Sequence, residues 1–328
     1  MKILITGGAG YIGSHVVYEF LDAGHEVIVV DDLSTGHRNL LPSDIPFYQG
    51  NIGDANLMDD IFSAHYIDTV IHFAGSIVVP ESVENPLKYY QNNTVNSLSL
   101  IHSCLKNNVK NFIFSSTASL YGSNHLGMIS EDFQPQTENP YATSKLMTEM
   151  MLRDIGQSRG LNYIILRYFN VAGADAKGRT GQITKTATHL IKVACHVALG
   201  IRPQLEIFGT DYATADGTCI RDYIHVTDLA NAHLNAFEAM SKGYKNKIYN
   251  CGYGRGFSVK EVVAHVEKVI GRDLPKIMSQ KRQGDPLSLI ADPNRLKQDT
   301  GWTPKNDNLE LIIKSALSWE KSLINKHQ

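Results

Sequence analysis

The segment Lys2–Gly13, KILITGGAGYIG, constrains the fold of this chain more than any other part of its sequence. Its apolar start predicts a buried β-strand, and the glycines at positions 7, 10 and 13 predict a tight turn that leads into a helix. Such a turn lets the backbone approach a pyrophosphate closely and leaves that group at a helix N-terminus, where free N–H groups favour negative charge. The alternative is a tight strand–helix turn that binds no ligand.

A second strand is predicted at Glu26–Val30, and it ends in the acid Asp31. A carboxylate about 20 residues beyond a glycine turn can accept a hydrogen bond from a ribose 2′-hydroxyl and would repel a 2′-phosphate. The order of strand, glycines, helix, strand and acid therefore predicts a site for NAD and disfavours its phosphorylated form.

Short apolar runs alternate with helical patterns up to Val171. This alternation predicts a parallel sheet covered by helices on both faces, with ligands beyond the carboxyl ends of its strands. The predicted strands are Lys2–Thr6, Glu26–Val30, Pro46–Gln49, Thr69–Phe73, Asn111–Ser115 and Asn162–Arg167, and the predicted helices are Ile12–Ala23, Ala55–Ala64, Tyr89–Asn107 and Tyr141–Ser158.

The pattern changes after Val171, where Gly173–Thr186 is rich in Gly, Thr and charge and is predicted to be a loop. Strands are then expected at Leu205–Phe208 and at Ile248–Asn250, the latter returning to the first sheet. Further helices are predicted at Ala187–Leu199, Asp228–Ser241, Ser258–Ile270 and Leu309–Leu323. We therefore predict an α/β protein with a Rossmann-type doubly wound parallel sheet (residues 1–171, with return segments near 217–250) and a smaller, interleaved C-terminal α/β substrate lobe (residues 172–328).

Composition excludes several classes of function. The net charge is −2 and no basic run is longer than Lys281-Arg282, which argues against nucleic acid as a partner. The 4 cysteines lack C-x-x-C spacing and the 13 histidines are dispersed, so no metal site is predicted. No apolar run is long enough to span a membrane, and a strand that starts near the first residue leaves no room for a signal peptide. A cytoplasmic location is expected.

Tyr141 and Lys145 lie four residues apart in the sequence YATSK, within a predicted helix. Residues at that spacing share one helix face, so the phenol and the ammonium point the same way. A neighbouring cation, and an oxidised nicotinamide, would lower the tyrosine pKa, so that Tyr141 takes a proton from an alcohol while a hydride leaves the carbon. The hydroxyls of Ser115, Ser116 and Thr117 follow a buried strand and suit hydrogen bonding to a reacting oxygen. A surface Tyr–Lys pair is the alternative.

Several motifs in a fixed order carry a family resemblance that spans nearly the whole chain. They are GGAGYIG, DDLSTG (31–36), HFAG (72–75), SST (115–117), YATSK and RYFN (167–170), followed by GTCIRDYIHVTDLA (217–230) and RQGDPLSLIAD (282–292). Together they resemble the extended short-chain dehydrogenase/reductase family, and within it the match is closest to the UDP-glucose (UDP-galactose) 4-epimerases.

The resemblance implies a tightly held NAD that is not consumed, and reversible 4-epimerisation of UDP-glucose and UDP-galactose through a 4-keto intermediate. Tyr141 would act as base and acid, Thr117 would hydrogen-bond the 4-oxygen, and Lys145 would position the nicotinamide ribose and lower the tyrosine pKa. The positions that match cofactor contacts of the family are Gly7, Gly10, Tyr11, Ile12, Gly13, Asp31, Asn51, Ile52, Phe73, Ala74, Gly75, Asn92, Ser115, Tyr141, Lys145 and Tyr168.

The family's contacts to the UDP-sugar also fall on identifiable positions. They are Thr117, Tyr141, Asn170, His189, Leu190, Glu206, Ile207, Phe208, Arg221, Arg282, Asp285 and Leu289. Arg221 and Arg282 suit the diphosphate because a guanidinium offers forked donors. Arg221 beside Asp222 could instead form a plain ion pair, and His189 could be structural.

The sequence departs from the family at some of these places. Asn51 stands where Asp is usual, Lys192 stands where Pro is common, and no lysine follows the FAG run. The loop Lys177–Thr186 is basic where relatives carry an acidic, proline-containing segment. Leu289 is smaller than the gate tyrosine of strictly non-acetylated enzymes, which predicts room for a 2-acetamido group.

Alternatives within and beyond the family stay open. Thr117 is followed by Ala118-Ser119, which cannot supply the acid–base pair of the related dehydratases. A 4-epimerase of another UDP-sugar (UDP-N-acetylglucosamine, a UDP-pentose or UDP-glucuronate) is one alternative, and a non-catalytic NAD-sensing protein is another. The family is usually a homodimer joined by two helices from each subunit, which implies Tyr89–Asn107 and Tyr141–Ser158 as the interface.

Overall fold

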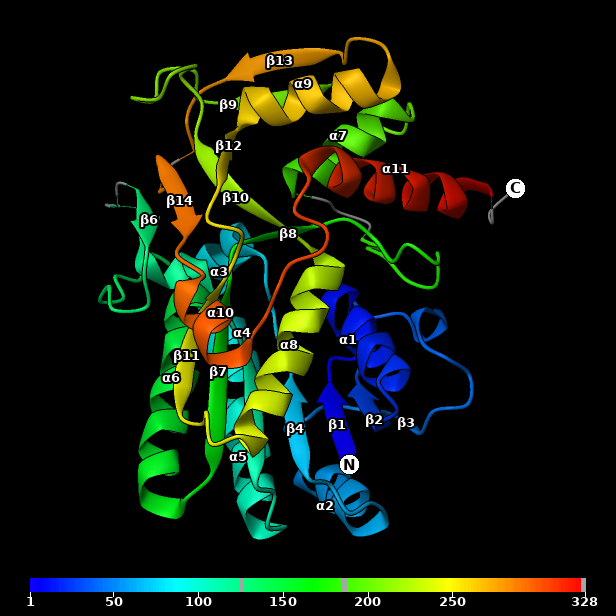
Figure 1. Cartoon of the computed structure of the whole chain (residues 1–328), viewed down its shortest axis with the longest axis vertical. Helices are drawn as coiled ribbons and strands as arrows, with labels where there is room; N and C mark the ends of the chain where they lie inside the picture. Colours follow the sequence, from blue (N-terminus) through cyan, green and yellow to red (C-terminus); the bar gives the residue numbers. More distant parts are fainter. Residues whose placement is uncertain (124, 126, 185–187, 283, 326–328) are drawn as a thin grey trace.

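The computed structural model describes residues 1–123, 125, 127–184, 188–282 and 284–325, and within them a seven-stranded parallel sheet forms the centre (Figure 1). Its strand order is β11-β7-β5-β4-β1-β2-β3. The strands are β1 (Lys2–Thr6), β2 (Glu26–Asp31), β3 (Phe47–Gln49), β4 (Thr69–His72), β5 (Asn111–Thr117), β7 (Asn162–Tyr168) and β11 (Lys247–Cys251). This order confirms the predicted doubly wound parallel sheet.

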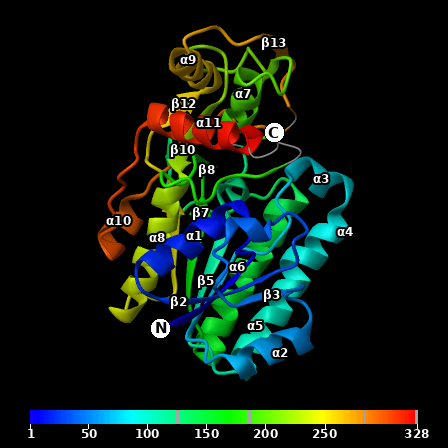
Figure 2. The ribbon, with the colours of Figure 1, turned by 90° about the vertical axis from the view of Figure 1, so that its right-hand side faces the viewer.

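Helices cover both faces of this sheet, because alternate residues of each strand face opposite ways. Ile3 and Ile5 belong to the apolar cluster under α1 and α8, whereas Leu4 belongs to the cluster under α2, α5 and α6. Figure 2 shows α1 and α8 on one side and α2, α5 and α6 on the other. Their bounds are α1 (Tyr11–Asp22), α2 (Ala55–Ala64), α5 (Asn96–Lys106), α6 (Pro140–Arg159) and α8 (Val226–Ser241).

The helix predicted at Tyr89–Asn107 is interrupted in the structure. A short helix α4 (Pro86–Tyr89) is followed by a π-helical turn, η2 (Tyr90–Val95), and then by α5. The wide turn lets the amide of Asn93 donate to the Ser76 carbonyl at 2.9 Å and to the Ser144 hydroxyl at 3.0 Å. Such insertions recur at functional sites, and the apolar period of the sequence does not reveal them.

A second, five-stranded sheet lies beyond the carboxyl edge of the first and draws its strands from distant parts of the chain (Figure 1). Strand β10 pairs in parallel with β8 and β14 and antiparallel with β12, so the return to the large sheet is made by α8 and β11. The strands are β6 (Met128–Ile129), β8 (Asn170–Ala172), β10 (Ile220–His225), β12 (Gly256–Ser258) and β14 (Ser288–Ala291). None of these segments was predicted as a strand; β10, with six residues, carries charged and polar side chains among its apolar ones and lacks the apolar run that marked the strands of the large sheet.

The remaining elements complete this upper part of the molecule. Strands β9 (Leu205–Phe208) and β13 (Lys276–Ser279) form a two-stranded parallel sheet. The other helices are α3 (Val79–Glu84), α7 (Leu190–Ala198), α9 (Val259–Ile270), α10 (Asn294–Thr300) and α11 (Leu309–Asn325), with single turns η1 (Arg38–Leu40) and η3 (Ala118–Tyr121). Residues 173–184 carry no helix or strand, as predicted, and residues 185–187 of the predicted loop and helix lie outside the described residues.

Candidate active site

The glycine turn between β1 and α1 has the close backbone packing that its sequence predicted. A Cβ atom on Gly7 would lie 2.5 Å from the backbone N of Ala74, and one on Gly13 would lie 2.3 Å from the Gly7 carbonyl oxygen. Gly7 also has a positive φ of 67°, a conformation that glycine adopts at little cost. Gly10 is the N-cap of α1 and offers no side chain to the first-turn N–H groups, which suits a bound anion.

Asp31 lies at the carboxyl end of β2 and fastens the same turn. Its Oδ2 accepts from the N–H of Ala9 at 2.9 Å and its Oδ1 from the N–H of Leu33 at 2.8 Å. Burial raises the pKa of this carboxyl, while the two backbone donors lower it. Each carboxylate oxygen has a second lone pair, so the group can still accept from a ribose hydroxyl.

Other residues predicted to contact a dinucleotide line the path from this turn toward Tyr141. A Cβ on Gly75 would lie 3.6 Å from Lys145 Nζ, so the HFAG segment runs directly past the lysine. The amide of Asn92 donates to Ser76 Oγ at 2.9 Å, and Asn51 Oδ1 accepts from the N–H of Gly53 at 2.8 Å. Ile52 and Ser115 are buried, and Phe73, Ala74 and Ile12 are partly buried. The Tyr11 hydroxyl donates to the Gly173 carbonyl at 2.7 Å and so ties the turn to the loop 173–184.

Thr117, Tyr141 and Lys145 meet at the carboxyl end of β5. Asn139 caps α6 by accepting from the Ala142 N–H at 2.9 Å, which fixes where the helix begins and how Tyr141 faces the sheet. Lys145 is 3% exposed; its Nζ donates to the Ser115 carbonyl at 3.0 Å and lies 4.9 Å from the centre of the Phe114 ring. A surface Tyr–Lys pair is therefore ruled out.

Burial controls the protonation of these groups. It raises the pKa of Tyr141, while a hydrogen bond from the Thr117 hydroxyl lowers it. It lowers the pKa of Lys145 to about 8, while the charge of Glu149 raises it. The arrangement can hold and exchange a proton at the phenolic oxygen of Tyr141.

The cationic side chains predicted for a diphosphate lie in the upper part of the molecule. Arg221 forms a short ion pair with Asp285, a side chain 64 positions further along, and not with Asp222. Asp222 is bound instead by the backbone N–H groups of Tyr253, Gly254 and Ala291. This rules out a plain Arg221–Asp222 ion pair. The guanidinium of Arg282 lies 3.7 Å from the centre of the Phe208 ring.

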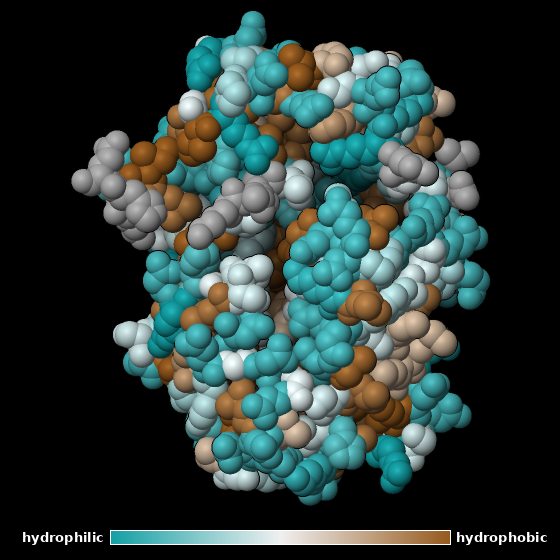
Figure 3. Space-filling view, turned by 180° about the vertical axis from the view of Figure 1, so that it is seen from behind, coloured by the Kyte–Doolittle hydropathy of each residue, from teal (hydrophilic) through white to brown (hydrophobic). Residues whose placement is uncertain are grey.

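The remaining predicted substrate residues divide by orientation. Ile207 is 1% exposed and belongs to the main apolar cluster, whereas Glu206 is exposed and accepts from the Ser279 hydroxyl at 2.6 Å. Leu289 is buried beside Ala118 and Phe169. Asn170, His189 and Leu190 lie together along one small cavity. Figure 3 shows a hollow between the upper and lower parts of the molecule.

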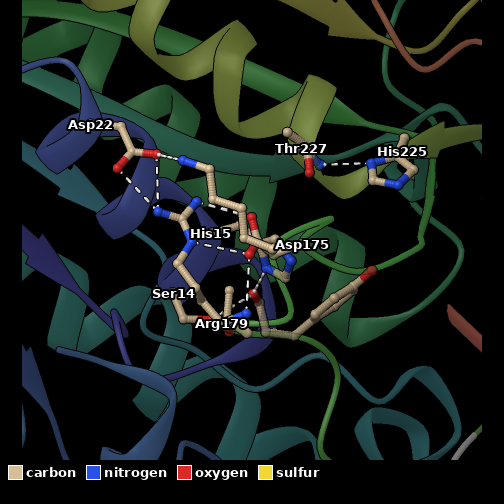
Figure 4. Close-up of polar contacts among 10 residues, drawn as sticks. Ser14, His15, Asp22, Asp175, Arg179, His225 and Thr227 are labelled. Carbon is tan, nitrogen blue, oxygen red and sulfur yellow. Dashed lines mark hydrogen bonds and ion pairs between the residues drawn. The ribbon is translucent and has the colours of Figure 1, made fainter. Parts of the chain in front are cut away.

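The loop 173–184 is fastened to α1 by side chains that the sequence did not single out (Figure 4). Arg179 donates to Asp175 through Nε at 3.0 Å and to Asp22 through Nη1 at 3.0 Å, and its guanidinium lies 4.3 Å from the centre of the Tyr18 ring. The Ser14 and Thr180 hydroxyls hydrogen-bond at 2.6 Å. Helix α1, which follows the cofactor turn, is therefore joined to the loop by several side-chain contacts.

Two further interactions around the site were not predicted from the sequence. The Tyr168 hydroxyl donates to His233 Nε2 at 2.6 Å, and His233 Nδ1 donates to the Leu229 carbonyl at 2.8 Å. Glu149 and Arg167 form a fully buried ion pair behind Lys145. The four-residue spacing of Tyr141, Lys145 and Glu149 was a signal for the second of these, whereas His233 gave none.

Comparisons with known proteins agree with this geometry. The family model described as NAD dependent epimerase/dehydratase family matches residues 3–252. The chain belongs to this family. It is 55% identical over 322 residues to UDP-glucose 4-epimerase of Azospirillum brasilense, covering 98% of this chain and 92% of that protein.

Solved structures of relatives extend the match to the whole fold. UDP-glucose 4-epimerase of Brucella ovis in complex with NAD is 41% identical, with a TM-score of 0.93 and 97% of each chain covered. The UDP-Glc/GlcNAc 4-epimerase of Campylobacter jejuni is 47% identical, with a TM-score of 0.85, covering 98% of this chain and 99% of that one. The chain is thus an NAD-dependent epimerase enzyme, as predicted. The close-packed glycine turn, the uncapped helix N-terminus and Asp31 fit the dinucleotide.

Two features are absent from the part of the chain that the structure describes. No group of three or more His, Cys, Asp or Glu side chains is arranged to hold a metal ion. No helix there is long and apolar enough to cross a membrane.

Because Asp31 accepts hydrogen bonds from two backbone N–H groups, its substitution by asparagine should destabilise the fold more than the same substitution at Asp32. Asp31→Asn places an NH₂ group against one of two backbone donors, so we expect the free energy of unfolding to fall by about 1–3 kcal/mol. Asp32→Asn is the matched control, because Asp32 is exposed and should lose far less. Urea denaturation of both variants checks this, and equal losses would contradict the assigned role of Asp31.

Proposed function

We propose that this protein interconverts UDP-glucose and UDP-galactose by 4-epimerisation with a resident NAD. The observation that carries the proposal is the meeting of Thr117, Tyr141 and Lys145 beside Gly75, at the end of the path that starts at the glycine turn. Relatives with the same fold are UDP-glucose 4-epimerases.

The chain's own residues then divide the work. Tyr141 takes the proton from the sugar 4-hydroxyl and later returns it, and Thr117 holds the 4-oxygen within hydrogen-bonding distance of that phenol. Lys145 is charged at pH values below its pKa of about 8, and this positive charge opposes the effect of burial, which keeps the Tyr141 phenol protonated. NAD would accept the hydride from C4 and return it, and C4 is a ketone in between.

A firm grip on UDP and a loose grip on the sugar allow both faces of that ketone to be presented. We assign the diphosphate to Arg221 and Arg282 and the uridine ribose to Asp285, because guanidinium groups bind phosphate through forked donors. Arg221 is already held in place by Asp285 and by its own bond to the Ile220 carbonyl at 2.8 Å. Asn170, His189 and Leu190 supply the remaining contacts to the sugar from β8 and the start of α7.

A second substrate, UDP-N-acetylglucosamine, is favoured by one position. Leu289 is paired with Arg221 between β14 and β10, so it lies beside the residue that we assign to the diphosphate. Leucine leaves more room there than tyrosine would. The relative from Campylobacter jejuni, 47% identical, carries the name of a UDP-Glc/GlcNAc 4-epimerase.

We also propose that the protein is a homodimer in the cytoplasm. Exposed apolar side chains lie on the neighbouring elements α3, α4, η2, α5 and α6, which pack against one another. Figure 3 shows apolar residues on the side of the molecule where α5 and α6 lie. The exposed apolar side chains are Val83, Leu87, Val95, Leu98, Met147 and Met150. A second copy of this chain would cover them. The four cysteines are free and buried, which suits a reducing compartment.

The central experiment uses purified protein with UDP-galactose and no added NAD. We expect chromatography to show UDP-glucose, because the cofactor is retained. Tyr141→Phe should lower kcat by about 10²-fold or more while NAD remains bound, since only the proton transfer is lost. Conversion by the unaltered protein only when NAD is added would contradict a resident cofactor. No conversion under either condition would contradict the function.

The N-acetylated substrate is tested at one side chain. The unaltered protein should convert UDP-N-acetylglucosamine, and Leu289→Tyr should remove that activity while conversion of UDP-galactose persists. Leu289→Met is the matched control, because it keeps the volume and should keep both activities. Failure of the unaltered protein on UDP-N-acetylglucosamine would overturn this extension alone.

The dimer is tested by a charge placed on the apolar flank. Met150→Glu should shift the mass measured by light scattering from two chains to one, because burying an unpaired carboxylate is unfavourable. Ile277→Glu, at an exposed apolar position on β13, should leave the dimer intact. A dimer that persists in Met150→Glu would place the interface elsewhere.

A further inference from the structure

Glu149 is a fully buried carboxylate to which the proposed mechanism gives no part. It lies on α6 four residues beyond Lys145, which itself lies four residues beyond Tyr141, so all three share one face of the helix. Only 1% of Glu149 is exposed. A carboxylate in such a place needs partners for its charge and its lone pairs.

Those partners come from the two strands that carry the site. Ser116, next to Thr117 on β5, donates to Glu149 Oε1 at 2.5 Å. Arg167, next to Tyr168 on β7, donates through Nε to Oε1 at 3.1 Å and through Nη2 to Oε2 at 2.6 Å. The carboxylate therefore joins α6 to the neighbours of two predicted site residues.

The network continues away from the site and is closed there. Arg167 Nη1 donates to the Tyr121 hydroxyl at 2.9 Å, and that hydroxyl donates to Asn250 Oδ1 at 2.8 Å. The Asn250 amide donates to the Ile129 carbonyl at 2.8 Å. Arg167, Tyr121 and Asn250 thus each have a hydrogen-bond partner beyond Glu149, and this fixes the position of the carboxylate from behind.

The charges around Lys145 are few. Glu149 acts on it from its own helix, on which Tyr141 lies four residues before it, and His72 lies near it on β4, where burial holds the histidine pKa well below its ordinary value. Arg167 on β7 reaches it only through Glu149. Glu149 thus supplies the negative charge in a set that otherwise holds two buried cations.

We propose that Glu149 is a positioning residue for the proton-transfer centre. Its carboxylate fixes α6 against β5 and β7 and offsets the charge of Arg167, so that Lys145 keeps its ammonium beside Tyr141. The effect of Glu149 on catalysis rests on the proposed function, whereas its effect on the protonation of Lys145 does not. Removal of the charge leaves two buried cations, Arg167 and Lys145, without the anion that offsets both, and Arg167 does not deprotonate.

The test compares Glu149→Gln, Glu149→Asp and the unaltered holoenzyme. In the unaltered protein kcat should fall as pH rises through about 8, where Lys145 loses its proton. In Glu149→Gln this alkaline limb should move to lower pH by about one unit, so that kcat falls about twofold at pH 7 and about fivefold to tenfold at pH 8 and above. Glu149→Asp keeps the negative charge, so its alkaline limb should lie at the same pH as that of the unaltered protein, even if kcat is only partly restored.

A readout that needs no turnover accompanies the pH profile. Acetylation of Lys145 by acetic anhydride, quantified by mass spectrometry across pH, follows the neutral amine, and its midpoint should also fall in Glu149→Gln. Asp228→Asn is the matched control, because Asp228 is buried and accepts from the Tyr253 hydroxyl and the Asn306 amide, away from Lys145. That control should lose stability without moving either midpoint.

The outcomes separate the two proposals. Midpoints that stay put in Glu149→Gln, with kcat lowered equally at every pH, would overturn the positioning role and leave a structural one. A shifted acetylation midpoint in a protein that converts no UDP-galactose would support the role of Glu149 and overturn the proposed function.

Discussion

The parallel pairing of seven strands gathers the chemistry of this protein at one edge. Strand β1 ends at the glycine turn, β2 at Asp31, β4 before Phe73, β5 at Thr117 and β7 at Tyr168. In a parallel sheet all these ends point the same way, and backbone groups there lie free of the ladder. Segments that are about 100 residues apart thereby meet within hydrogen-bonding distance of each other. The second sheet covers this edge and completes the cleft.

Burial of charge at that edge sets the electrostatic conditions of the site. Lys145 and Glu149 lie on one helix and both are almost fully buried, which is costly unless each charge is compensated. Arg167 compensates Glu149 from one side, and the Ser115 carbonyl accepts from Lys145 on the other. The ammonium keeps a reduced affinity for its proton and lies next to a phenol that burial holds protonated. A positive charge added by the oxidised cofactor would favour the phenolate, which links cofactor state to proton transfer.

The parts of the site that could be predicted from the sequence are those whose residues lie close together along the chain. The glycine turn, Asp31 and the pair Tyr141 and Lys145 each depend on residues fewer than about 20 positions apart, and regular strands and helices fix their relative places. The large sheet followed for the same reason, with strand bounds that differ from those predicted by one or two residues. Partners far apart in sequence were not predictable, because no local period encodes Arg221 with Asp285 or Tyr168 with His233.

Strand geometry divides one group of predicted substrate contacts. Glu206, Ile207 and Phe208 are consecutive residues of β9, and successive side chains of a strand face opposite ways. All three side chains cannot face one ligand, and that of Ile207 faces the core. The resemblance supplied this run as a unit, whereas the period of the strand divides it into a core residue and two outward ones.

The loop 173–184 shows how a departure from the family is compensated within the chain. Lys192 stands where relatives commonly carry proline, and it is buried at the start of α7 against Glu320 of α11, with a second bond of 2.8 Å to the Gln182 carbonyl. Glu320 Oε2 also lies 3.0 Å from His196 Nε2, within hydrogen-bonding distance. The indole of Trp319 donates to the same Gln182 carbonyl at 3.2 Å. A proline restricts a loop through its own backbone, whereas here a buried ion pair on the C-terminal helix holds the loop end. The basic, threonine-rich sequence of the loop is thus compatible with a fixed position beside His189 and Leu190, where the sugar contacts are proposed.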